Sequence, residues 1–241
     1  ARGVAVQTQT NVTDVGPDGH HFTVQTDHGS FKAPSLVIAT GGPSIPKMGS
    51  SEFDYDIARQ FGLAVIEPRP GLVPLTFDPG HLLDELAGVS LEATVKLGKV
   101  QFTRALLFTH RGLSGPVILQ ISSYRREGDT ITIDLLPGTD VFGYFKSARD
   151  RTPKKEVRTA LAQVLPKRLA LRLVEGTDVD GRLAEISDKA LRRLAERINA
   201  WRITPNGSEG MRTAEVTVGG VDTRDLSSKT MQAQLVSGLY F

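Results

Sequence analysis

The chain has 241 residues, of which 39% are hydrophobic, and a formal net charge of +2 from 29 basic and 27 acidic residues. It has no cysteine, which excludes a disulfide scaffold, a catalytic thiol and Cys-ligated metal centres. The balanced charge predicts no nucleic-acid or membrane partner, and the lack of a long apolar run or signal-peptide pattern predicts a cytoplasmic location.

Residues 3–40 predict a β-meander that leads into a glycine-containing loop. The polar and apolar residues of 21–26 alternate after a turn sequence, Gly16-Pro-Asp-Gly19. Residues 36–39 predict a short strand buried on both faces, which ends at Thr40-Gly41-Gly42-Pro43. Glycines there would let a dinucleotide approach the backbone closely. An ordinary Gly-Pro turn is the alternative interpretation, and this motif alone does not decide between the two.

After this loop, Ser51 is predicted to cap a helix over residues 52–61, which Gly62 ends. The segment 67–75 contains three prolines and is predicted to be an irregular crossing between two domains.

Residues 72–136 predict mainly strands, with the clearest alternation at 90–97 and 130–135. A helix is predicted from Pro116 to Ser123, after the flexible Gly112 and Gly115. His110 and Ser114 do not predict a hydrolase, because no acid and no nucleophile-elbow motif accompany them.

Residues 140–200 predict helices, one starting at Thr152 and another capped by Ser187. The first of these helices carries basic residues, and further basic residues follow it in the sequence. Acidic residues lie among them and just after them. We therefore expect a solvated helical surface here rather than a binding patch. The basic residues are Lys154, Lys155, Arg158, Lys167, Arg168 and Arg172.

The closing stretch repeats the pattern of the opening one, with a strand at 215–218 followed by Gly219-Gly220. Two halves of one sheet domain, interrupted by an insert, explain that repetition. The predicted fold class is α+β or α/β. Residues 1–66 and 214–241 would form the sheet domain, 67–139 a β-barrel-like part of the insert, and 140–213 its helical part.

Four motifs in the same order resemble the BaiN-type flavoproteins, the aminoacetone-oxidase-like or NAD(FAD)-utilising dehydrogenase family. The resemblance covers nearly the whole chain. The motifs are Ala39-Thr-Gly-Gly-Pro-Ser-Ile-Pro-Lys-Met-Gly49, Pro70-Gly-Leu-Val-Pro-Leu75, Leu107-Phe-Thr-His-Arg-Gly-Leu-Ser-Gly-Pro116 and Ala214-Glu-Val-Thr-Val-Gly-Gly-Val-Asp222 with Gly238-Leu-Tyr-Phe241.

The resemblance implies a two-dinucleotide-binding-type FAD domain and a parent protein that transfers hydride between FAD and a small-molecule substrate, with NAD(P)H left open as a further partner. It places eight residues near FAD, and it indicates no catalytic residue, no metal, no particular substrate and no oligomeric state. These cofactor-binding residues are Val12, Ala39, Thr40, Gly41, Gly42, Gly219, Gly220 and Val221.

Three departures from the family pattern are visible. No Gly-x-Gly-x-x-Gly turn precedes Ala1, no flavin-contacting tail follows Phe241, and Glu52-Phe-Asp54 replaces a glycine-rich sequence. We therefore expect a fragment of an oxidoreductase that is inactive by itself and binds FAD weakly or not at all. A non-enzymatic substrate lid or protein-interaction module is the alternative.

Overall fold

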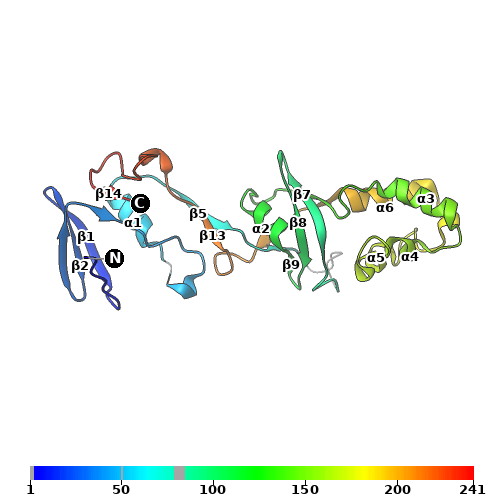
Figure 1. The fold of residues 1–241 in the computed structure, drawn as a ribbon, viewed down its shortest axis with the longest axis horizontal. Helices are drawn as coiled ribbons and strands as arrows, with labels where there is room; N and C mark the ends of the chain where they lie inside the picture. The colour runs from blue at the N-terminus through cyan, green and yellow to red at the C-terminus, as the bar shows by residue number, and fades with distance from the viewer. Residues whose placement is uncertain (1–2, 50, 79–84) are drawn as a thin grey trace. The chain divides into compact units, whose positions relative to one another are not determined.

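The computed structural model describes residues 3–49, 51–78 and 85–241, and the chain folds into two compact units. Unit 1 joins residues 1–69 to 217–241, and unit 2 is the continuous stretch 70–216. In Figure 1 the blue strands near the N-terminus and the red C-terminal segment belong to unit 1, and the green and yellow elements belong to unit 2.

Unit 1 begins with a three-stranded antiparallel sheet in the order β1-β2-β3. Its strands are β1 (Val12–Asp18), β2 (His21–Thr26) and β3 (Gly29–Ala33). One side chain from each of the first two strands, Val15 and Phe22, is buried in the core of unit 1. The predicted meander is therefore confirmed over these three strands.

The strand before the glycine loop differs from its prediction. β4 (Leu36–Val37) has two residues and pairs in parallel with β14 (Leu239–Tyr240). Val37 is 65% exposed, so the expectation of a strand buried on both faces is wrong. Among the described residues only β14 pairs with β4, and a strand with one short neighbour has too little around it to be covered on both sides.

The predicted helix after the loop is confirmed as α1 (Phe53–Gln60), which follows the 3-10 turn η1 (Pro46–Met48). Its Tyr55, Ile57 and Ala58 are buried. The last two pack in the core of unit 1, so α1 joins the core residues of the sheet to those of the C-terminal segment. The buried core residues are Val15, Phe22, Ile38, Ile57, Ala58, Leu63, Leu226, Ala233 and Leu239.

The proline-containing segment is a strand and not the irregular crossing that was predicted. β5 (Val65–Gly71) pairs with β13 (Val216–Val221) in a two-stranded sheet. Each strand of such a pair has one free edge, where the missing N–H of Pro68 or Pro70 costs no ladder hydrogen bond. A proline in a strand is tolerated there for this reason.

Unit 2 contains a seven-stranded sheet in the order β11-β10-β7-β8-β9-β6-β12, with antiparallel pairing between neighbours. Residues 100–108 form one continuous strand of this sheet. The strands are β6 (Leu75–Thr76), β7 (Ser90–Leu97), β8 (Val100–Phe108), β9 (Gly112–Ser114), β10 (Ile131–Asp134), β11 (Trp201–Ile203) and β12 (Gly207–Ser208).

The predicted helix after Gly115 is confirmed as α2 (Pro116–Ser122), which packs on β7 and β8. Val117, Ile118 and Ile121 are fully buried against the sheet. Gly115 has a φ of +86°, and a Cβ there would lie 2.7 Å from the carbonyl oxygen of Ala105. Both the backbone conformation and the close approach therefore require glycine.

The helical part of unit 2 consists of α3 (Val141–Arg151), α4 (Val157–Leu161), α5 (Lys167–Val174), the 3-10 turn η2 (Leu183–Glu185) and α6 (Asp188–Asn199). Ser187 caps α6 as predicted, since its hydroxyl accepts a hydrogen bond from the Ala190 N–H at 3.2 Å. Thr152 does not start a helix. It ends α3, and its hydroxyl donates to the Ala148 carbonyl at 2.9 Å.

One continuous hydrophobic core joins the sheet of unit 2 to its helices. Phe108 and Trp201 stack at 6.5 Å between ring centroids within it, and Phe145 of α3 is also fully buried there. The chain is thus a mixed α and β structure whose two larger sheets are antiparallel.

We expect Gly115→Ala to lower the free energy of unfolding by more than about 2 kcal/mol, because the added Cβ strains the backbone and overlaps Ala105. Urea unfolding followed by fluorescence of the single, buried Trp201 measures this loss. The control is Gly98→Ala, where φ is +56° but no atom lies within 4 Å, and we expect a loss of about 1 kcal/mol. Equal losses in the two variants would contradict the argument.

Candidate functional site

The loop that follows β4 exposes its backbone to solvent. Ala39, Thr40 and Gly41 are exposed, and Gly42 is half-buried. Gly41 has a φ of +72°, and a Cβ there would meet nothing within 4 Å. The glycine at this position therefore serves a turn, and the open space above it leaves room for a ligand.

Tyr55 of α1 brings the two glycine pairs of the sequence together. A Cβ at Gly42 would lie 2.8 Å from the Tyr55 hydroxyl, and one at Gly220 would lie 3.1 Å from Cε1 of the same ring. Tyr55 is 3% exposed, and burial raises the pKa of its hydroxyl. A loop and a strand far apart in the sequence thus meet on one buried ring, because each has a glycine where it contacts that ring.

Thr217 of β13 holds the first of these loops in place. Its hydroxyl oxygen accepts a hydrogen bond from the Ser44 N–H at 3.2 Å. A Cβ at Gly42 would lie 2.7 Å from the same oxygen, so no other residue fits between the loop and the strand without displacement. Neither Thr217 nor Tyr55 was predicted from sequence, since nothing in the spacing of the motifs points to them.

The remaining predicted residues have different surroundings. Gly219 has a φ of +102°, and a Cβ there would lie 2.6 Å from the Glu67 carbonyl oxygen of β5. Gly219 and Gly220 thus lie within β13 and not after it, and Gly219 is explained by close strand pairing. Val221 packs against the core of unit 1.

Val12 is 42% exposed at the start of β1, opposite Thr26, and no contact of the described residues joins it to the glycine loop.

Asp54, which precedes Tyr55 in α1, is a third residue that sequence reasoning missed. Its Oδ1 is buried and has no hydrogen-bond partner among the described residues. Burial raises the pKa of this carboxyl group, and the nearby charges of Asp56 and Glu52 raise it further. A buried, unpartnered carboxylate oxygen is rare in proteins and calls for an explanation such as an absent ligand. The available signal was the departure of Glu52-Phe-Asp54 from the family pattern.

This region fits a cofactor that carries phosphate groups. It offers exposed backbone at residues 39–41, side-chain-free positions at Gly41 and Gly42, and a loop anchored by Thr217. Backbone N–H groups beside glycines can approach an anion closely, which larger residues would prevent.

Unit 2 has a separate, shallow pocket of about 340 Å³, and two of its six lining residues are aromatic. Phe102 and Tyr124 lie side by side there, with 5.8 Å between ring centroids, and Gln120 has an amide oxygen with no hydrogen-bond partner. The two aromatic rings of this pocket can stack a planar ring. The lining residues are Leu72, Phe102, Gln120, Ser123, Tyr124 and Val216.

No group of three His, Asp or Glu side chains is arranged to hold a metal ion in residues 3–49, 51–78 and 85–241. Within the same residues no helix is both long and apolar enough to cross a membrane.

A comparison of the sequence with models of protein families finds a match over unit 2. Residues 69–216 match the model of the HI0933-like protein barrel and H2TH domain. The chain belongs to the HI0933-like family. The match begins and ends within one residue of unit 2, and it confirms the resemblance to the BaiN-type flavoproteins.

The chain is also similar to three curated proteins. It is 45% identical to the ribosomal RNA dihydrouridine synthase of Escherichia coli K12 over 99% of the chain, and 45% identical to that of Haemophilus influenzae over 91%. It is 26% identical to a 3-dehydro-bile acid delta(4,6)-reductase of Clostridium scindens over 98%.

The chain spans 60%, 56% and 62% of the lengths of these relatives, in the same order. Two of the three names refer to RNA, which runs against the expectation of no nucleic-acid partner that the net charge had suggested.

We expect Asp54→Asn to increase the free energy of unfolding near neutral pH, because it removes a buried charge whose carboxyl pKa is raised. The penalty acts only when Asp54 is ionised, so the gain should shrink as the pH falls through the raised pKa of the folded carboxyl, and it should vanish well below 3.8, where the carboxyl is protonated in both folded and unfolded chains. Urea unfolding at several pH values measures this.

The control for this prediction is Asp56→Asn in the same helix. Asp56 is exposed and accepts from Arg59 at 3.0 Å, so its removal should not stabilise the chain. A pH-independent gain in Asp54→Asn, or an equal gain in the control, would contradict the assignment.

Proposed function

We propose that this chain is part of a flavin-dependent reductase that converts uridine to dihydrouridine in ribosomal RNA. The observation that carries the proposal is the 45% identity to the E. coli ribosomal RNA dihydrouridine synthase over 99% of the chain, against 26% to the bile acid reductase. The similarity runs through both units. It therefore includes the glycine loops of unit 1 and the helices of unit 2.

In this proposal residues 1–66 and 214–241 belong to a two-dinucleotide-binding-type FAD domain, and residues 67–139 and 140–213 form its insert. Ala39, Thr40, Gly41, Gly42 and Gly220 would approach FAD. What supports Ala39, Thr40 and Gly41 is their exposed backbone, whereas Gly42 and Gly220 lie against Tyr55 and are carried by the family resemblance alone. When bound and reduced by a two-electron donor of the NAD(P)H class, FAD would supply the hydride that, together with a proton, reduces a carbon–carbon double bond.

The other three predicted cofactor residues have weaker support. Gly219 and Val221 are already explained by strand pairing and core packing, and Val12 lies on a sheet that no described contact joins to the loop. They stay predictions. NAD(P)H as the electron donor also stays a prediction.

As the substrate, we propose uridine in ribosomal RNA in place of the small molecule that was expected from the sequence. A uracil ring is planar and has an N–H and two carbonyl groups at its edge. The rings of Phe102 and Tyr124 offer a stacking surface, which supports the binding of such a ring.

The test is a chimera of the E. coli enzyme in which this chain replaces the segment aligned to it. In a strain that lacks its own enzyme, we expect the chimera to restore dihydrouridine in ribosomal RNA, measured by mass spectrometry of nucleosides. An absorbance spectrum of the purified chimera serves as control, because flavin bands that survive desalting show a folded holoprotein.

A flavin-loaded chimera that leaves ribosomal RNA unmodified would overturn the proposed substrate. A folded, colourless chimera would favour the alternative of a non-enzymatic lid or interaction module.

We further expect Thr217→Val to weaken flavin retention by the chimera about tenfold, since the loop loses the acceptor of the Ser44 N–H without a change in side-chain volume. Flavin released during dialysis measures this. Thr213→Val is the matched control in unit 2, where the lost hydrogen bond runs to the Gly210 carbonyl. Equal release from both variants would show that Thr217 has no special role.

A further inference from the structure

Residues 151–174, named here the basic hairpin, contain α4, α5 and the turn between them. They carry seven Lys and Arg residues against one acidic residue, a net charge of +6. The rest of the chain has 22 basic and 26 acidic residues, a net charge of −4. The small overall charge therefore conceals a strong local excess of positive charge, which is an indication of a polyanionic partner.

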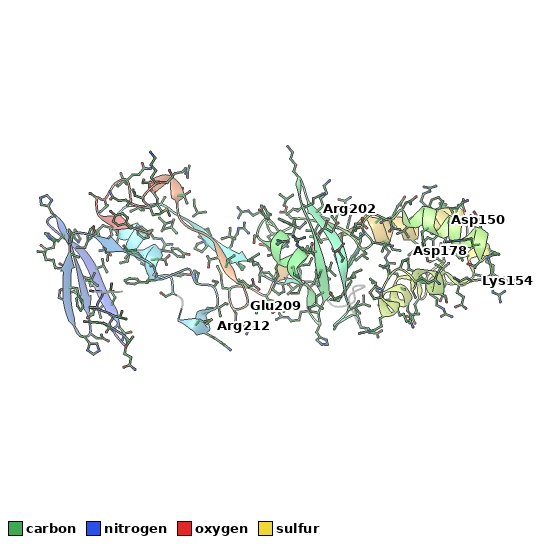
Figure 2. All side chains as sticks on the ribbon, viewed as in Figure 1. Asp150, Lys154, Asp178, Arg202, Glu209 and Arg212 are labelled. Carbon is green, nitrogen blue, oxygen red and sulfur yellow. The ribbon has the colours of Figure 1, made fainter. Side chains whose placement is uncertain are left out.

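The fold places this charge on one outer surface. The apolar residues of the hairpin pack into the core of unit 2, so the polar residues of both helices are left at the surface. Figure 2 shows Lys154 near the tip of the helical part of unit 2, with Asp150 and Asp178 also labelled there. The buried residues are Val157, Ala160, Leu161, Leu165, Leu169, Ala170, Leu173 and Val174.

The positive charges of the hairpin are largely free of acidic partners. Within the described residues, Arg158 is the one hairpin cation with a carboxylate in ion-pair distance, the Glu156 oxygen at 2.8 Å. Arg168 donates to the backbone carbonyls of Glu85 and Ala87 and has no carboxylate partner there. The sequence-based expectation of a solvated surface stays a prediction, which the binding inference below would replace.

Neighbouring helices show the contrast. Lys146 and Arg149 of α3 share the carboxylate of Asp188, and Arg193 of α6 pairs with Asp178. Those cations could bind an anion only after an ion pair breaks, whereas Lys154 and Lys167 of the hairpin can bind one directly.

A hollow of about 270 Å³ on the hairpin has a lining without carboxylates. It is formed by Arg158, Thr159, Ala162, Lys167 and Leu171. At its rim, the Thr159 hydroxyl and Lys167, which has no carboxylate partner among the described residues, suit a phosphodiester group, whereas Arg158 is paired with Glu156 through Nε. A second hollow, of about 220 Å³, shares Leu171 but includes Glu85 and Glu175 beside Arg168 and Arg172, so it suits an anion less well.

We infer that the basic hairpin binds the phosphodiester backbone of the RNA substrate, with the hollow between Arg158 and Lys167 as the seat of one phosphate group. This inference rests on the proposed function, which supplies RNA as the polyanion. Contacts of this kind fix the position of an RNA without reading its sequence. The hairpin would thus hold a folded RNA while another part of the protein selects the uridine.

The experiment measures binding of a fluorescently labelled RNA hairpin to the 241-residue chain by anisotropy at several salt concentrations. The variant Lys154→Gln with Lys167→Gln removes two unpaired charges from the basic hairpin. The control, Lys96→Gln with Lys99→Gln, removes two exposed charges from the β7–β8 turn. All three proteins should unfold at the same urea concentration.

We expect the hairpin variant to bind RNA about tenfold more weakly at about 0.1 M salt, and its slope of log K against log salt to fall by about 2. The control variant should bind within about twofold of the original chain. Equal weakening in both variants, or binding of anionic lipid vesicles in preference to RNA, would overturn the inference.

The two proposals can fail separately. If the chimera makes dihydrouridine but the hairpin variant binds RNA normally, the docking surface is wrong and the function stands. If the hairpin variant loses RNA binding but the flavin-loaded chimera leaves ribosomal RNA unmodified, the surface stands and the reaction is wrong.

Discussion

The contact of two glycines with the ring of Tyr55 is the constraint on which unit 1 depends. Gly42 and Gly220 lie more than 170 residues apart, and any side chain at either position would overlap the ring or approach it too closely. Thr217 adds a hydrogen bond to the same loop. Steric exclusion and one hydrogen bond thus join the first and last segments of the chain, and the backbone that remains exposed at residues 39–41 is held by a rigid support.

Unit 2 is organised differently, around a hydrophobic core shared by a sheet and a set of helices. The helices bury their apolar faces in this core and therefore leave their charges outside. On α3 and α6, Lys146, Arg149 and Arg193 form ion pairs with Asp188 or Asp178. On the basic hairpin, most Lys and Arg residues have no carboxylate in ion-pair distance among the described residues. This difference separates a solvated surface from a surface that can bind a polyanion, because a paired cation must lose one partner before it gains another.

Under the proposed RNA binding, the net charge of +2 is a misleading guide to partners, for a reason that applies to other chains. Net charge sums over the whole molecule, but an anion interacts with the charges within about a Debye length, roughly 10 Å in 0.1 M salt. A hairpin of net charge +6 is therefore attractive to RNA even when the remainder of the chain is negative. The distribution of charge along the sequence already contained this signal.

The sequence by itself determined the features that depend on neighbouring residues. These include the β-meander of residues 12–33, the helix after Ser51, the Ser187 cap and the family membership carried by four motifs. Only the tertiary structure decided that Thr152 ends a helix, that Pro68 lies in a strand, and that Tyr55 and Thr217 hold the glycine loop. Each of these depends on a partner distant in sequence, and local propensity carries no information about which distant residues will meet.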